Sequence, residues 1–346
     1  NIDIRTNGNI TVTEELGDFR IGLIESTRRN VVLTGRHADI IDSPNEEEFS
    51  GTTADVVGIN LTFSAPEGHV GTFENPLEIN SSNVSIGAVK ADAELDIVLV
   101  EIADLNVDRI RSESGDVSLL ALDGSILDYF DDTAADVIGV NQFLTAQGQT
   151  IGQSDNDLDI DSSTVRPGRL VARANNSAYI TETDSSLNVQ SVFVPGGPIR
   201  LTVTDTAATD EDFILMEGGL IFSNETNITL NVGDDVDTRL GSAMFAAQEI
   251  FINGDAGNAD DHARERRLGA EVERQGALRR DEQLRRAPLD AGVRCAQGPR
   301  HERHGDSGRQ EGRLDHHEER GGPARDARSH DAGRRHVVRA HARVAG

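Results

Sequence analysis

The chain has 346 residues, a single Cys, no Trp, two Tyr and a formal net charge of −27. One Cys excludes a disulfide-based scaffold, and the most apolar runs, such as Ile97–Val100, are too short to span a membrane. Residues 1–260 carry 13 Lys and Arg against 45 Asp and Glu, whereas residues 261–346 carry 20 Arg against 15 Asp and Glu. Because phosphate binding requires a basic surface, we do not expect nucleic acid to be a partner of the first region.

The start of the chain carries no visible signal peptide. Residue 1 is Asn1, and no basic segment followed by an apolar stretch appears after it. The chain begins within a repeating pattern, so we interpret it as an internal fragment of a longer protein.

Short runs of alternating apolar residues predict β-strands throughout the region 1–260. Each run has about four to six residues, is bounded by Gly, Asn, Asp or Ser, and begins roughly 8–12 residues after the previous one. Helical spacing of apolar residues is scarce before residue 240. We therefore predict an all-β chain, with runs that include Asn9–Glu14, Asn30–Leu33, Ile97/Leu99, Leu105/Val107, Val117/Leu119 and the region of Ile126.

An internal repeat organises these runs. Residues 54–104 align without a gap to residues 135–185, with 17 identities in 51 positions. The alignment defines an 81-residue repeat, which lengthens by one position further along the chain. We predict that residues 1–260 consist of a partial copy over about 1–53, full copies at 54–134 and 135–216, and a divergent unit at 217–260.

Two architectures fit short, evenly spaced strands: a parallel β-solenoid and a series of β-sandwich modules. A sandwich core of this size needs large buried aromatic residues, and the unit 54–134 offers only Phe63, Phe73, Tyr129 and Phe130. A solenoid fills a narrow interior with Val, Ile, Leu and Ala and places Asn, Ser, Asp and Gly at its corners. We predict the solenoid, with three or four turns in each repeat.

The composition changes abruptly after Asp260. Residues 261–346 contain no Ile, Thr, Asn, Lys, Phe, Tyr or Met, and their few Val, Leu and Cys residues are too sparse for a core. We favour an out-of-frame translation of GC-rich DNA, and the alternatives are a disordered charged tail or an Arg-rich nucleic-acid arm. Neither His301-Glu302-Arg303-His304 nor His316-His317-Glu318 is predicted to bind metal, because the spacing is loose and no folded frame supports it; Cys295 is a lone thiol.

Acidic runs in the first region raise the question of calcium. The runs are Asp131-Asp132, Asp210-Glu211-Asp212, and Asp234-Asp235 with Asp237. Calcium takes six to eight oxygen ligands, which acidic corners could supply, but neither a calcium β-roll nonapeptide nor an EF-hand loop is present. We predict a solvated acidic surface and no cofactor, and keep a calcium-binding extracellular repeat protein as the alternative.

Catalytic residues are not predicted anywhere in the chain. Residues 1–260 offer only His37, His69 and Lys90 beside their carboxylates and arginines, and no GxSxG nucleophile motif. Most of the acids lie in units that resemble one another, whereas a catalytic group occurs in one place. A polysaccharide-active β-helix enzyme remains the less favoured alternative.

Several phrases resemble repeats of very large bacterial surface and secreted proteins, the filamentous-haemagglutinin-like adhesins and related giant repeat proteins, some of which also carry calcium-binding repeats. The phrases are NPLEINSS (75–82), ELDIVLVEIADLNVDRI (94–110), SGDVSLLALDGSILD (114–128), AYITETDSSLNVQSV (178–192) and NITLNVGDDVD (227–237) followed by AAQEIFINGDAGNAD (246–260). The resemblance covers about residues 1–260 and implies a right-handed parallel β-helix stalk, an extracellular or cell-surface location and an adhesive or structural role. Its expected partners are a host or neighbouring-cell surface, matrix or polysaccharide, and it brings no catalytic residues.

Overall fold

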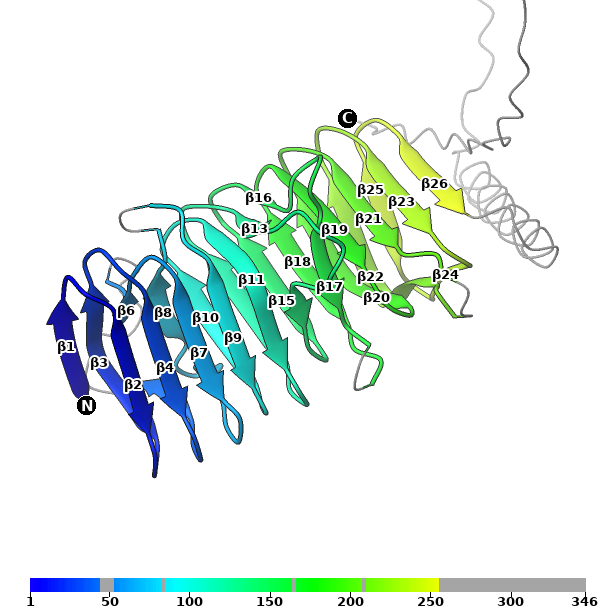
Figure 1. The fold of residues 1–346 in the computed structure, drawn as a ribbon. Helices are drawn as coiled ribbons and strands as arrows, with labels where there is room; N and C mark the ends of the chain where they lie inside the picture. The colour runs from blue at the N-terminus through cyan, green and yellow to red at the C-terminus, as the bar shows by residue number, and fades with distance from the viewer. Residues whose placement is uncertain (44–52, 83–84, 164–165, 207–209, 255–346) are drawn as a thin grey trace, which may run out of the picture. The chain divides into compact units, whose positions relative to one another are not determined.

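A computed structural model describes residues 1–43, 53–82, 85–163, 166–206 and 210–254. In these ranges the secondary structure is entirely β, without a helix, and the strands run parallel in a β-solenoid of about ten turns (Figure 1). The predicted all-β parallel solenoid is therefore confirmed.

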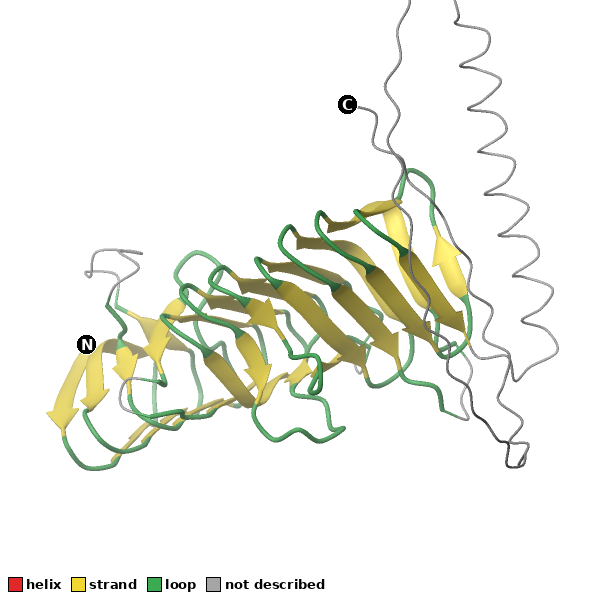
Figure 2. Ribbon diagram, turned by 90° about the horizontal axis from the view of Figure 1, so that it is seen from above, coloured by secondary structure: helices red, strands yellow, loops and turns green. Residues whose placement is uncertain are grey.

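Each turn of the solenoid contributes strands to two parallel sheets, which we call sheet A and sheet B (Figure 2). Sheet A consists of β1 (Ile2–Thr6), β3 (Phe19–Ser26), β5 (Ile40–Asp42), β6 (Val56–Val57), β8 (Leu77–Asn80), β10 (Ile97–Glu101), β12 (Val117–Ala121), β15 (Gln142–Ala146), β18 (Leu170–Ala174), β20 (Leu187–Val194), β22 (Phe213–Ser223), β24 (Val236–Thr238) and β25 (Ala243–Ala246). Sheet B consists of β2 (Ile10–Glu14), β4 (Val31–Gly35), β7 (Leu61–Ala65), β9 (Val89–Ala93), β11 (Leu105–Ser112), β13 (Ile126–Asp128), β14 (Val137–Ile138), β16 (Thr150–Ile151), β17 (Leu158–Asp161), β19 (Ser177–Glu182), β21 (Ile199–Val203), β23 (Ile228–Val232) and β26 (Ile250–Gly254).

The core is built from rows of apolar side chains that continue from one turn to the next. In sheet A, Leu99 pairs with Leu119, Leu119 with Leu144 and Leu144 with Ala172, and all four side chains are buried. Alternate residues of each strand point inward, which is the alternation seen in the sequence. Each row is buried only by its neighbours, so the fold is stabilised by interfaces between successive turns.

Asn and Asp residues at the corners connect the turns. Just before a strand, the side chain of such a residue accepts a hydrogen bond from the backbone N–H of the corresponding residue in the next turn. Asn30 Oδ1 accepts from Asn60 N at 3.4 Å, Asp96 Oδ1 from Asp116 N at 2.8 Å, and Asp116 Oδ1 from Asn141 N at 3.0 Å. These bonds pair backbone donors at the corners with an acceptor, so the frequent Asp and Asn before strands have a structural role.

The 81-residue repeat exchanges the two sheets. Strands β7, β8, β9 and β10 correspond in sequence to β15, β17, β18 and β19, and each pair has one member in sheet A and the other in sheet B. From β7 the chain passes through β8, β9, β10, β11 and β12 to β13, and then through β14 to β15. Strands β13 and β14 both pair with β11 in sheet B, so they count as one layer, and the chain changes sheet seven times. Seven half-turns are three and a half turns for each repeat, a value between the three and the four turns predicted from the sequence.

Candidate functional site

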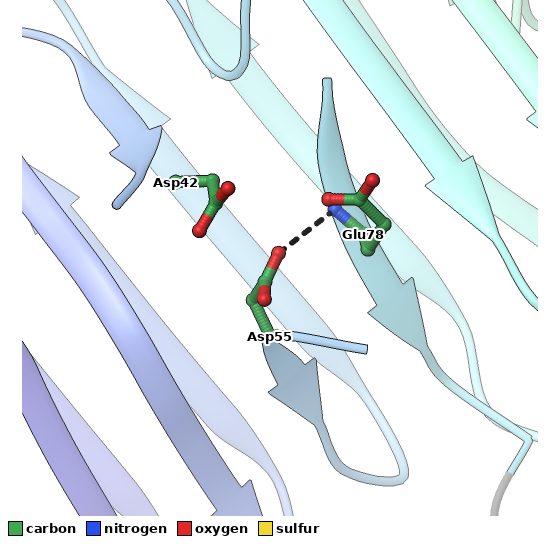
Figure 3. A group of neighbouring side chains, drawn as sticks. All are labelled: Asp42, Asp55 and Glu78. Carbon is green, nitrogen blue, oxygen red and sulfur yellow. Dashed lines mark hydrogen bonds between the residues drawn. The ribbon is translucent and has the colours of Figure 1, made fainter. Parts of the chain in front are cut away.

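Three carboxylates meet on sheet A where the partial copy adjoins the first full copy, and we call them the first triad. Asp42 ends β5, Asp55 lies just before β6 and Glu78 lies in β8, and each offers a carboxylate oxygen within 4.8 Å of the others (Figure 3). Asp55 Oδ2 accepts a hydrogen bond from the backbone N–H of Glu78 at 3.3 Å. The pairing of β5 and β6 with β3, and of β6 with β8, brings these residues together.

The first triad favours protonated carboxyls. Burial raises the pKa of Asp55, and the hydrogen bond with the Glu78 side chain and the charge of Asp42 raise it further. Burial also raises the pKa of Glu78, and again the charge of Asp42 adds to this effect. Three adjacent carboxylates cannot all remain charged in a partly buried place, so the group retains protons at a pH where exposed acids have lost them.

A second triad lies one repeat further along the chain, on sheet B. Asp128 ends β13, Asp136 precedes β14 and Asp159 lies in β17, and their exposed fractions are 9%, 4% and 7%. Asp136 Oδ2 accepts from the backbone N–H of Asp159 at 3.1 Å, as Asp55 does from Glu78 in the first triad. In the alignment of the two copies, Asp136 is equivalent to Asp55 and Asp159 is equivalent to Glu78.

The acids of the second triad are strongly perturbed. Burial, followed by the charge of Asp128, raises the pKa of Asp136 to about 9. Burial also raises the pKa of Asp159 to about 7, and the charges of Asp128, Asp157 and Asp132 contribute. Such perturbed acids are common in functional sites and also in structural clusters, so the surroundings must decide between the two.

A cavity of about 460 Å³ lies beside the second triad. Its lining side chains are all polar: Thr, Ser and Asn residues, Arg200, and the five aspartates Asp131, Asp132, Asp155, Asp157 and Asp159. The loop after β13, the loop before β17, and strands β17, β19 and β21 supply most of these residues. We call this space the acidic cavity.

Arg200 is held on one wall of the acidic cavity. Its guanidinium forms an ion pair with Asp157, donates to the Ser154 carbonyl oxygen at 3.1 Å and lies 4.7 Å from the centre of the Tyr179 ring. Thr181 Oγ1 also donates to Asp157, at 3.0 Å. The hydrogen bonds and charge of Asp157 raise the pKa of Arg200, so this cation is committed to Asp157.

Four positions that line the acidic cavity are apolar in the first full copy. In the alignment of the two copies, the cavity residues Ser154, Asp157, Thr181 and Thr183 take the places of Phe73, Pro76, Val100 and Ile102. At these four positions only the second copy carries oxygen-bearing side chains, although the backbone of both copies follows the same strand order.

Two buried glutamates also repeat. Glu101 Oε2 accepts from Ser81 N at 2.9 Å and from Ser81 Oγ at 2.7 Å, while Glu182 accepts from Ser162 N at 3.0 Å and Ser162 Oγ at 2.6 Å. Burial raises the pKa of Glu101 to about 7 and that of Glu182 well above its usual range. Both side chains point into the core from the last residues of β10 and β19, so they link turns and do not face a ligand.

The acidic runs singled out in the sequence have different surroundings. Asp131 and Asp132 line the acidic cavity. Asp212 Oδ1 accepts from Asp235 N at 3.1 Å, and Asp234 Oδ2 accepts from Glu211 N at 3.1 Å, so these runs connect successive turns. Asp237 pairs with Arg239 at 3.3 Å.

Sequence reasoning missed both triads. The members of each triad come from three separate segments of the chain and meet only through the register of the sheets. The one usable signal was the spacing of Asp55 and Glu78, which Asp136 and Asp159 reproduce in the second aligned copy.

The two histidines considered for catalysis take part in contacts with neighbouring residues. His69 Nδ1 accepts from Asp96 N at 3.1 Å, and its own backbone N–H donates to Asp39 Oδ1 at 2.8 Å. His37 lies 2.9 Å from Glu67 in an exposed pair, and Lys90 lies in β9.

The whole region 261–346 falls outside the described residues. It includes Cys295, His301-Glu302-Arg303-His304 and His316-His317-Glu318. No helix with the length and apolar character of a membrane span occurs in the described part of the chain.

Comparison of the chain with known protein families, with curated proteins and with solved structures finds no match.

Proposed function

We propose that residues 1–260 belong to the non-catalytic stalk of a large repeat protein on the surface of a bacterial cell or secreted from it. The observation that carries this proposal is the continuous pairing of turns from β1 to β26, built from units that repeat along the chain. Such an architecture extends by adding turns, each stabilised by the one before it. A negative charge spread over the turns keeps neighbouring copies apart in solution.

The stalk would carry a binding element away from the cell or offer many weak contacts along its length. The partners proposed are a host or neighbouring-cell surface, matrix or polysaccharide. The resemblance of phrases such as ELDIVLVEIADLNVDRI to giant surface adhesins supports this choice, and in the structure that phrase spans β10 and most of β11.

Immunogold labelling tests the location. Antibodies raised against the chain are applied to intact and to permeabilised cells of the organism that encodes it. We expect gold particles on intact cells, at a distance from the outer envelope. Labelling that requires permeabilisation would contradict the proposal.

An activity screen tests the non-catalytic role. The full chain is incubated with a panel of anionic polysaccharides, and new reducing ends and unsaturated products are measured. We expect neither to accumulate above the level of a heat-inactivated sample. Turnover of any member of the panel would replace the stalk with the β-helix enzyme alternative.

A further inference from the structure

We propose that the acidic cavity binds a calcium ion, with Asp159 and Asp132 as carboxylate ligands and Asp155 contributing from the loop before β17. This inference does not depend on the stalk role, because it rests on the lining of a single cavity.

Asp159 is the residue that points to a ligand. It is only 7% exposed, lines the cavity, and its side chain has no hydrogen-bond or ion-pair partner among the described residues. The corner aspartates elsewhere, such as Asp96 and Asp116, accept the backbone N–H of the next turn. Burying a carboxylate without a hydrogen bond or an opposite charge destabilises the folded protein. A bound cation would supply that opposite charge to Asp159.

The charge of the lining favours a cation. Arg200 neutralises Asp157, which leaves Asp131, Asp132, Asp155 and Asp159 facing the cavity without a paired cation among the described residues. Each of the twelve residues that line the cavity has a polar side chain, and five of them are aspartates.

The donor set suits calcium. Calcium accepts six to eight oxygen ligands in irregular geometry, whereas magnesium requires a near-octahedral shell and keeps most of its waters. Carboxylates and hydroxyls reach the cavity from loops and strands of several turns, an arrangement that has no fixed symmetry. A water molecule takes about 30 Å³ in the liquid, so a cavity of about 460 Å³ has room for the ion and for waters that complete its shell.

Calorimetric titration of the full chain with calcium chloride tests the proposal. The measurement is made at physiological ionic strength, which screens diffuse attraction to an acidic chain. We expect one saturable site. Asp159→Asn, which keeps the shape of the side chain, should weaken binding by about tenfold or more.

Asp132→Asn is the second variant, because Asp132 lies at an exposed loop position where a substitution disturbs little of the fold, and Asn can still accept from Ala134 N. It should weaken binding as well. Asp123→Asn removes the same charge at a position away from the cavity and should leave the affinity unchanged. Circular dichroism confirms that each variant is folded.

Three outcomes would overturn the proposal. One is the absence of saturable heat in the wild type. Another is equal weakening by Asp123→Asn, which would mean diffuse charge attraction. The third is binding that survives Asp159→Asn and Asp132→Asn but disappears in Glu78→Gln, which would place the ion at the first triad.

Discussion

The two acidic triads occupy related positions in consecutive repeats, yet their surroundings differ. Around the first triad, the aligned positions carry Phe73, Pro76, Val100 and Ile102; around the second they carry Ser154, Asp157, Thr181 and Thr183. Both copies share the strand order and a hydrogen-bonded pair of acidic residues, Asp55 with Glu78 and Asp136 with Asp159. The four neighbours are apolar in the first copy and polar in the second, and the acidic cavity lies beside the polar ones. The comparison separates what the solenoid needs, which both copies share, from what is particular to one copy.

The largest expected effect concerns a turn that both copies share. Gly71 and Gly152 have φ values of +67° and +64°, and an added Cβ would lie 2.1 Å from Val98 O and 2.2 Å from Tyr179 O. Replacing either glycine by Ala should lower the free energy of unfolding by about 4 kcal/mol, because the backbone itself must move. Urea denaturation followed by circular dichroism measures the loss.

Gly8→Ala is the matched control, since its nearest contact would be Thr6 Oγ1 at 3.7 Å. A cost below about 1 kcal/mol at Gly152 but not at Gly71 would show that the two copies differ in backbone as well as in side chains.

The next effect concerns the buried glutamates, which the copies also share. The pKa of Glu101 is raised from 4.5 to about 7 by burial. The folded state therefore binds this proton more tightly than the unfolded state. The proton on Glu101 contributes its full amount to the free energy of unfolding below about pH 4.5, and this contribution is lost as the pH rises through about 7. Above that pH the free energy of unfolding should be lower by about 3 kcal/mol.

Glu101→Gln should make the stability less dependent on pH, and urea denaturation at a series of pH values measures this. Glu182→Gln should act in the same direction, because burial raises the pKa of Glu182 as well. Asp123→Asn serves as the control for charge alone. An unchanged pH slope in both Gln variants would refute the assignment of the proton to these side chains.

The smallest effects test the neighbours that differ. Val100→Thr buries a hydroxyl at a position that is 2% exposed and should cost about 2 kcal/mol. Thr181→Val removes the hydrogen bond from Thr181 to Asp157 and should cost about 1 kcal/mol. Melting curves of both variants measure the two losses of unfolding free energy. A larger loss for Thr181→Val than for Val100→Thr would mean that packing around the acidic cavity tolerates less change than the matching surface of the first copy.

The sequence was sufficient for the class of fold. Alternation at Ile97/Leu99 and Val117/Leu119 follows directly from inward-facing positions of a strand, and Asp96 and Asp116 mark the corners before those strands. The repeat was visible because glycines such as Gly71 and Gly152 and the pairs Ser81–Glu101 and Ser162–Glu182 occupy positions that tolerate little change.

The exchange of sheets and the site itself could not be predicted. A repeat length does not reveal how many residues make one turn, because the loops between strands vary in length. Asp128, Asp136 and Asp159 become neighbours only through the pairing of β13 and β14 with their adjacent strands. The acidic run Asp210-Glu211-Asp212 looked equally suited to a metal from its letters alone, but Asp212 accepts the backbone N–H of Asp235 in the next turn and Glu211 accepts that of Thr206.

The seven half-turns of each repeat have a consequence for how such a protein can grow. When an odd number of half-turns is duplicated, each strand of the new copy joins the sheet opposite to the one that holds its parent strand. The sequence of the repeat must therefore fit both sheets. Any feature encoded once per repeat then emerges on alternating sides of the stack, separated by three and a half strand spacings, or roughly 17 Å. A gene that gained one further copy would thus place the duplicated feature on the opposite sheet of the solenoid.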